Sequence, residues 1–350
     1  MIKGFVFGKF SPFHKGHESL INFAITQCDY LSIIICVSNK ETLPGDIRKR
    51  WIQESFKNFN NIDIIVFNYD EDILTNTSVS SKKVSEKWSI VFKELVPSVD
   101  VVITSEPYGN YVANFMNIKH IIFDIEKKTV PISSTAIKNN IFSKWNFLPN
   151  SVKPYYCIKV IILGTESTGK STLTKQLAAY YNCNYVLEAG RDIIPDSTKF
   201  EFNDLHIVAD EHASRIRNAV LGNSPLVIID TDIHITKSYA RFVFNKELKV
   251  DKDIYNTNLA DLYLYLNNDV TYVQDGTRLE FKQRNNLDKC HRKTLIKNNI
   301  TITEIEGNWQ DRFLKAIKYI DQLIQLKTNL YQKIATRTQI VNATKKVAFT

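Results

Sequence analysis

The chain has 350 residues, of which 44% are hydrophobic and 11% aromatic, enough for two globular domains with a core each. Its formal net charge of +8 suits anionic ligands such as nucleotides, but Lys and Arg are spread along the chain, so we expect no nucleic-acid partner. Five cysteines without a CxxC pair, and no apolar run near the roughly 20 residues of a membrane span, exclude disulfide-rich and membrane classes and predict a cytoplasmic protein.

The first motif follows an apolar strand-like run at residues 2–7. His14 and His17 stand three apart in the sequence HKGH, directly before a helix that we predict over 18–27. Both imidazoles can face one anion there, with the positive end of the helix dipole behind them. Two surface histidines in a turn would show the same spacing, but the whole strand, glycine, HxGH and helix pattern favours a nucleotide site.

The rest of the first half alternates strand-like apolar runs with helical segments as far as residue 124. This alternation predicts a parallel, doubly wound sheet and so an α/β domain. Further on, Ser133, Ser134 and Thr135 stand where a helix is predicted to begin. They would either cap that helix or bind phosphate, and the sequence does not decide between the two.

The second half opens with a phosphate-binding loop. A β-branched run at 158–163 leads into GTESTGKST, and a helical segment follows. Gly164 and Gly169 let the backbone curl so that its N–H groups point at phosphate oxygens. Lys170 would reach the β- and γ-phosphates, and Ser171 would place its hydroxyl on Mg²⁺.

An apolar strand over 226–229 ends in two carboxylates, Asp230 and Asp232. In doubly wound folds such a strand end faces the ligand, so one carboxylate could accept a hydroxyl proton while Asp230 orients Mg²⁺. A strand ending in a polar turn is the alternative. Arg278 and Arg284 lie in a polar stretch that we interpret as a lid over the γ-phosphate.

The HxGH element together with ISSTAIK, residues 132–138, resembles the nucleotidyltransferase superfamily. Their order before a phosphate-binding loop resembles the NadR-like family of bifunctional nicotinamide mononucleotide adenylyltransferases and ribosylnicotinamide kinases, from Gly4 to about Leu323. The resemblance implies two doubly wound domains, an adenylyltransferase at 1–150 and a P-loop kinase at 157–325. Residues 326–350 have no counterpart in it.

The resemblance also implies roles for individual residues. His14 and His17 would bind the ATP phosphates and stabilise the transition state. The other expected ATP contacts in the first domain are Gly8, Lys9, Phe10, Arg48, Arg50, Ser133, Ser134, Thr135 and Lys138, the last in place of the family's usual Arg. Those in the second domain are Gly164, Glu166, Ser167, Thr168, Gly169, Lys170, Ser171, Thr172, Arg278 and Arg284. The expected substrate contacts are Trp88, Glu188, Arg191, Tyr272 and Asp275.

Three functions follow from these patterns. The first is a two-step enzyme that phosphorylates ribosylnicotinamide and adenylylates the resulting nicotinamide mononucleotide to NAD, with ATP and Mg²⁺, as a monomer or a homo-oligomer. The second is an NAD-sensing transcriptional regulator, although the first nucleotide motif begins at Gly8 and we expect no helix-turn-helix before it. The third is an adenylyltransferase with another acceptor, fused to an unrelated small-molecule kinase.

Overall fold

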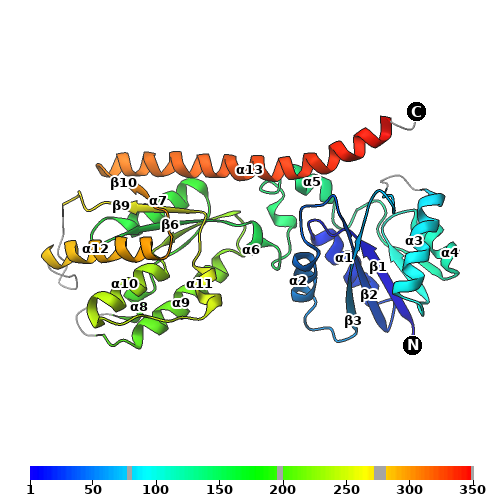
Figure 1. Cartoon of the computed structure of the whole chain (residues 1–350), viewed down its shortest axis with the longest axis horizontal. Coiled ribbons are helices and arrows are strands. Elements are labelled where there is room, and N and C mark those ends of the chain that lie inside the picture. Colours follow the sequence, from blue (N-terminus) through cyan, green and yellow to red (C-terminus); the bar gives the residue numbers. More distant parts are fainter. Residues whose placement is uncertain (77–80, 195–199, 272–280, 348–350) are drawn as a thin grey trace. The chain divides into compact units, whose positions relative to one another are not determined.

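The computed structural model describes residues 1–76, 81–194, 200–271 and 281–347, with side chains described as far as residue 330. It divides the chain into two compact units (Figure 1). Unit 1 comprises Met1–Val152 together with Thr328–Thr350, and unit 2 comprises Lys153–Lys327. Among the described residues, no helix is both long enough and apolar enough to span a bilayer.

Unit 1 is built on a five-stranded parallel sheet in the order β3-β2-β1-β4-β5. Its strands are β1 Lys3–Gly8, β2 Tyr30–Ser38, β3 Ile62–Tyr69, β4 Val101–Thr104 and β5 Lys119–Ile122. Its helices are α1 Lys15–Ile25, α2 Gly45–Ser55, α3 Lys82–Leu95, α4 Gly109–Met116 and α5 Ser134–Asn139, with the 3₁₀ turn η1 Trp145–Phe147. Figure 1 shows α1 and α2 on one side of this sheet and α3 and α4 on the other.

Unit 2 repeats the architecture with the strand order β10-β9-β6-β8-β7, again all parallel. Its strands are β6 Ile158–Gly164, β7 Asn184–Val186, β8 Leu226–Asp230, β9 Leu262–Leu266 and β10 Thr303–Ile305. Its helices are α6 Lys153–Tyr156, α7 Lys170–Tyr181, α8 Gly190–Ile193, α9 Asp204–Ala219, α10 Ile233–Phe244, α11 Lys252–Thr257 and α12 Phe281–Lys297, together with α13 Trp309–Val347 as far as Lys327. The prediction of two doubly wound parallel-sheet domains is confirmed.

The central strands explain why the sequence adopts this fold. Consecutive side chains at 33–35 of β2 and at 160–163 of β6 are all 0% exposed. A strand with one wet face would expose every second residue, so helices must cover both faces of each sheet. In each unit the central strand, β1 or β6, has later strands on either side, and ligands bind beyond the carboxyl ends of strands at such a switch point.

Two helices differ from the sequence prediction. Helix α1 begins at Lys15 and not at Glu18, so the HxGH motif forms the start of the helix itself. The last helix, α13, runs from Trp309 to Val347, so residues 326–347, which have no counterpart in the resemblance, are helical.

Candidate functional sites

The first candidate site surrounds the two histidines of unit 1. His14 is the N-cap of α1, and its Nδ1 accepts a hydrogen bond from the backbone N–H of His17 at 3.3 Å. The two imidazoles are stacked, with ring centroids 3.6 Å apart, and the buried rings of Phe10 and Phe13 pack beside His17. The motif therefore holds both imidazoles in one fixed stack at a helix N-terminus, the arrangement that anions favour.

Packing against His14 explains why a glycine stands between the two histidines. A Cβ atom on Gly16 would lie 3.0 Å from both Nδ1 and Cε1 of His14, and 3.4 Å from Ile132. A side chain here would require the His14 ring to move by a few tenths of an ångström. This close approach favours a residue without a Cβ at the third position of HxGH.

Both histidines are held in the neutral form. Burial, and to a smaller extent the charge of Lys127, lower the pKa of His14 to about 4. Burial, His14 and Lys127 lower the pKa of His17 in the same direction. Lys127 lies beyond β5 and was missed by sequence reasoning, although the basic pair Lys127-Lys128 before ISSTAIK was a usable signal. A bound phosphate would raise both pKa values and draw protons onto the rings.

We expect His14 to make unit 1 sensitive to acid. Folded His14 binds its proton more weakly than an unfolded histidine, so stability falls as the pH drops below 6.5 until the folded group protonates near pH 4. The loss from this residue is about 3 kcal/mol at most. In His14→Asn, which retains a capping side chain, urea midpoints followed by tryptophan fluorescence should decline less over this range. If the urea midpoints of the variant and of the parent protein declined equally, His14 would not be the cause of the acid sensitivity.

A charged network lies beside the histidines. Lys9 Nζ is 3.4 Å from Glu41 and 3.9 Å from Glu71. Arg48 is fully buried, donates to the backbone oxygen of Lys9 at 2.8 Å and pairs with Glu41 at 2.6 Å. Burial lowers the pKa of Lys138, and the charge of Glu41 opposes this. The structure thus brings together the predicted Lys9 and Arg48, and adds two carboxylates that sequence reasoning missed.

The other residues predicted for this site differ in exposure and in local role. Ser133 caps α5, its Oγ accepting from the N–H of Ala136 at 3.2 Å, so it does what capping serines ordinarily do. Ser134 is half-buried, whereas Thr135 and Arg50 are exposed. Gly8 ends β1.

Trp88 belongs to the hydrophobic core of unit 1. It packs against Tyr69 and Phe92, and its indole N–H donates to the carbonyl of Thr75 at 3.2 Å. Its side chain is 8% exposed. Its predicted stacking on nicotinamide therefore stays a prediction.

The second candidate site is the phosphate-binding loop of unit 2, whose shape requires its glycines. Gly164 and Gly169 have φ values of +141° and +85°, which L side chains rarely adopt. A Cβ on Gly164 would lie 2.7 Å from the carbonyl oxygen of Leu266, and one on Gly169 would lie 2.3 Å from the Trp309 ring. Ser167 between them is left-handed as well, with φ +60°.

Two buried arginines fix the loop from outside. Arg284 on α12 donates from Nε to the carbonyl of Glu166, and Arg312 on α13 donates from Nη1 to the carbonyl of Thr168, both at 2.9 Å. The predicted Arg284 is therefore at the loop. Arg312 was missed, because nothing in its local sequence marks it. Lys170, the first residue of α7, donates to the carbonyl of Thr165 at 2.9 Å, and Thr172 is exposed.

Ser171 and Asp230 form a pair suited to Mg²⁺. The hydroxyl of Ser171 donates to Oδ2 of Asp230 at 2.5 Å, and Oδ1 of Asp230 is buried without a hydrogen-bond partner in the described part of the chain. Burial raises the pKa of Asp230 to about 6, while Lys170 acts in the opposite direction. Mg²⁺ prefers such oxygen ligands. No cluster of three or more His, Cys, Asp or Glu among the described residues could hold a metal alone, so phosphates would complete the coordination.

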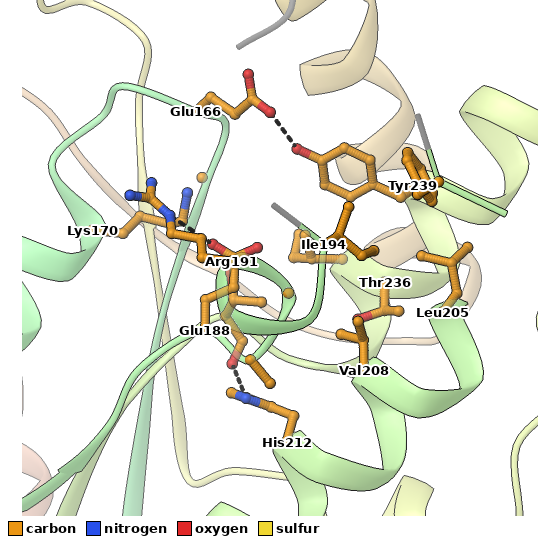
Figure 2. A pocket seen from close by; sticks show the side chains of 16 residues that line it. Glu166, Lys170, Glu188, Arg191, Ile194, Leu205, Val208, His212, Thr236 and Tyr239 are labelled. Atoms are coloured by element: carbon orange, nitrogen blue, oxygen red, sulfur yellow. Dashed lines mark hydrogen bonds and ion pairs between the residues drawn. The ribbon is translucent and has the colours of Figure 1, made fainter. Parts of the chain in front are cut away.

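A cavity of about 230 Å³ adjoins the loop (Figure 2). Lys170 and Glu166 line it, and the hydroxyl of Tyr239 donates to Glu166 at 3.0 Å. Glu188 and Arg191 pair at 3.7 Å and line it too, and their contact with substrate stays a prediction. The apolar lining is Ile194, Phe200, Leu205, Val208 and Ile235.

Asp232 is the N-cap of α10, and its predicted catalytic role stays a prediction. Its Oδ1 accepts the backbone N–H groups of His234 and Ile235, at 3.0 and 3.1 Å, which caps α10. Its Oδ2 contacts Nδ1 of His234. Both oxygens are thereby engaged in a fully buried cap. The predicted Tyr272, Asp275 and Arg278 lie outside the described residues.

Fold and sites define a two-domain protein with a nucleotidyltransferase-type domain followed by a P-loop, kinase-like domain. A family model for the citrate lyase ligase C-terminal domain matches residues 5–166, and one for an AAA domain matches residues 159–312. The chain is 30% identical to the trifunctional NAD biosynthesis/regulator protein NadR of Escherichia coli, over 92% of this chain and 83% of that protein. The chain belongs to the NadR family, whose members act in NAD biosynthesis.

Other comparisons agree with this assignment. NadR of Salmonella typhimurium is 29% identical over the same shares of the two chains. A phosphopantetheine adenylyltransferase of Mycoplasma mycoides is 27% identical over 39% of this chain and 94% of its own length. A solved structure described as NadR protein in complex with NR has a TM-score of 0.65 at 19% identity and covers 92% of this chain and 95% of that one. At that identity, the match shows a shared fold.

Proposed function

We propose that the chain makes NAD in two steps. Unit 2 phosphorylates the 5′-hydroxyl of ribosylnicotinamide with ATP, and unit 1 adenylylates the resulting mononucleotide to NAD, releasing pyrophosphate. The observation that carries this proposal is that each unit has its own nucleotide-type site at the carboxyl end of its own central strand. Similarity to NadR along most of the chain, and solved NadR structures described with NR, NAD and AMP-PNP, support the choice of substrates.

In unit 1 the mononucleotide phosphate attacks the α-phosphorus of ATP, and the bond to pyrophosphate breaks. The protein has no covalent step to perform, so catalysis consists of positioning and charge stabilisation. His14 and His17 donate to the phosphates from the helix N-terminus, and Lys9 and Lys138 add positive charge. Arg48 donates to the backbone carbonyl of Lys9 and so positions the Lys9 side chain.

In unit 2 the 5′-hydroxyl oxygen bonds to the γ-phosphorus as the bond to ADP breaks. Glu188, in the cavity wall, is placed to accept the hydroxyl proton. Lys170 neutralises charge on the transferred group. Mg²⁺, bound through Ser171 and Asp230, would supply further neutralisation of the phosphates.

Incubation of the purified chain with ATP, Mg²⁺ and ribosylnicotinamide tests the proposal, with the products separated by chromatography. Mononucleotide followed by NAD is the expected outcome. Parallel reactions with nicotinamide mononucleotide and with 4′-phosphopantetheine decide the acceptor of unit 1, because a phosphopantetheine adenylyltransferase is among its relatives. Transfer only to 4′-phosphopantetheine would reject the NAD assignment.

Lys138→Arg should lower the ATP Michaelis constant of the adenylyltransferase reaction a few-fold. Arginine keeps the positive charge of Lys138 and adds a planar fork that can bind phosphate through two parallel hydrogen bonds. The kinase reaction of the same preparation is the control and should not change. An ATP Michaelis constant that stays the same or rises would show that the fork does not reach the phosphates.

A further inference from the structure

One tryptophan of the chain differs from the other three in its surroundings. Trp51, Trp88 and Trp145 are core residues of unit 1, each at most 8% exposed. Trp309, the first residue of α13, is 57% exposed and is the only tryptophan in the sequence of unit 2. A single exposed aromatic residue is ordinary on a protein surface, so its meaning depends on what it lies against.

The indole of Trp309 lies on the phosphate-binding loop. A Cβ atom on Gly169 would be 2.3 Å from Cζ3 of the indole and 3.0 Å from Cη2, so the ring approaches the loop this closely because the residue is a glycine. Gly169 directly precedes Lys170, where the loop becomes α7. The exposed part of the ring therefore borders the place where the loop would bind the phosphates of ATP.

Hydrogen bonds hold the backbone around Trp309 in place. Arg312, one turn further along α13, is 1% exposed and donates to the carbonyl oxygens of Gly307 and Thr168, each at 2.9 Å. Its guanidinium carbon also lies 5.6 Å from the centre of the Trp309 ring. Gly307 in turn donates its N–H to Asp269 at 2.7 Å. A flat surface that is held in place before a ligand arrives loses little freedom on binding.

The cavity of unit 2 and Trp309 belong to opposite sides of the sheet. The cavity lining comes from the loop and from segments that follow β7 and β8, including α9 and α10 (Figure 2). In the order β10-β9-β6-β8-β7, these two strands stand on one side of β6, from which the loop starts. Trp309 follows β10, the outermost strand on the other side.

The geometry of phosphoryl transfer assigns different ligands to these two sides. The attacking oxygen and the leaving oxygen lie roughly in line, on opposite sides of the γ-phosphorus. With the acceptor hydroxyl in the cavity, the ADP part of ATP extends away from the cavity, toward the side of β9 and β10. Its adenine is a flat aromatic ring, and such rings stack on the face of an indole.

We propose that Trp309 stacks on the adenine of the ATP bound to unit 2 and so strengthens the binding of the phosphate donor. This rests on the kinase function proposed for unit 2. Trp309 takes no part in the transfer itself. Stacking uses the face of the base, which every nucleotide has, so Trp309 contributes affinity for a base without choosing among bases.

A binding titration tests the contact without any acceptor. AMP-PNP with Mg²⁺ is added to the full chain, and inorganic tripolyphosphate, which has phosphates but no base, is added to a second sample. AMP-PNP should quench the tryptophan fluorescence and tripolyphosphate should not. Most of this quenching should be absent in Trp309→Phe, whose remaining signal comes from the three buried tryptophans of unit 1.

Steady-state kinetics separate stacking from a structural role. Trp309→Ala should raise the ATP Michaelis constant of ribosylnicotinamide phosphorylation at least about tenfold, the loss expected when a base-stacking ring is removed. The kcat and the Michaelis constant for the riboside should change little. Trp309→Phe keeps an aromatic face and should raise the ATP Michaelis constant less.

Tyr180→Ala is the matched control. Tyr180 is also 57% exposed, but it stands near the C-terminal end of α7, far along the helix from the loop. This variant should keep the parent ATP Michaelis constant. Adenylylation of nicotinamide mononucleotide by unit 1 should be the same in all three variants and reports that each chain is intact.

Two results would overturn the assignment. Equal quenching by AMP-PNP in the parent chain and in Trp309→Phe would show that the base does not meet Trp309. A folded Trp309→Ala protein with a lower kcat and an unchanged ATP Michaelis constant would show that the ring only supports the loop. Quenching that depends on Trp309, in a chain that phosphorylates no riboside, would support the stacking and reject the acceptor proposed for unit 2.

Discussion

Lys170→Ala should abolish most of the phosphorylation of ribosylnicotinamide, by on the order of 10²–10³ in rate. Lys170 begins α7 inside the phosphate-binding loop and lines the cavity, so its ammonium is placed to neutralise charge on the transferred phosphoryl group. Adenylylation of nicotinamide mononucleotide should continue, because that site belongs to unit 1. The variant is therefore expected to make NAD from the mononucleotide but not from the riboside, as measured by chromatography of both reactions.

Lys175→Ala is the matched control. It makes the same change on an exposed residue of the same helix and should leave both reactions intact. Lys170→Ala removes little apolar surface, so circular dichroism should show a folded protein. If folded Lys170→Ala lost adenylylation as well, a single composite site would have to replace two independent ones.

The strands could be predicted because each is a local signal. In β2, β6 and β8 nearly every residue is apolar, since both faces of these parallel strands are covered. The two loops were equally legible, because glycines and charged residues at fixed spacing mark where a backbone must approach phosphate. At both loops the geometry depends on residues that are adjacent in the sequence, so a local motif is enough to predict it.

What escaped prediction depends on residues far apart in the chain. Arg312 reaches the loop at Thr168 across 144 positions, and Arg48 reaches Lys9 across 39. Neither has a local pattern that distinguishes it from a surface arginine. Asp232 shows that a local pattern can carry two meanings: an acidic pair at a strand end suggests catalysis, but its second member also precedes α10, where a buried Asp serves as the N-cap.

His17→Ala should give the converse of Lys170→Ala, with accumulation of mononucleotide from ribosylnicotinamide and very little NAD. His17 is half-buried and its Nδ1 is enclosed, so the ring is held rigidly against His14 at the helix N-terminus. Removing a preorganised donor to the phosphates costs on the order of 10²–10³ in rate. The backbone N–H of His17 still bonds to His14, so α1 keeps its cap and unit 1 should stay folded.

The measurement for His17→Ala follows both products over time from ribosylnicotinamide, and its internal control is the kinase rate, which should equal that of the parent chain. His17→Asn, which keeps a side-chain N–H, should lose less adenylylation than His17→Ala if hydrogen bonding to phosphate is what matters. Circular dichroism must show both variants folded. A folded His17→Ala protein that adenylylates the mononucleotide within about tenfold of the parent rate would remove His17 from the transition state and leave the charge stabilisation to Lys9, His14 and Lys138.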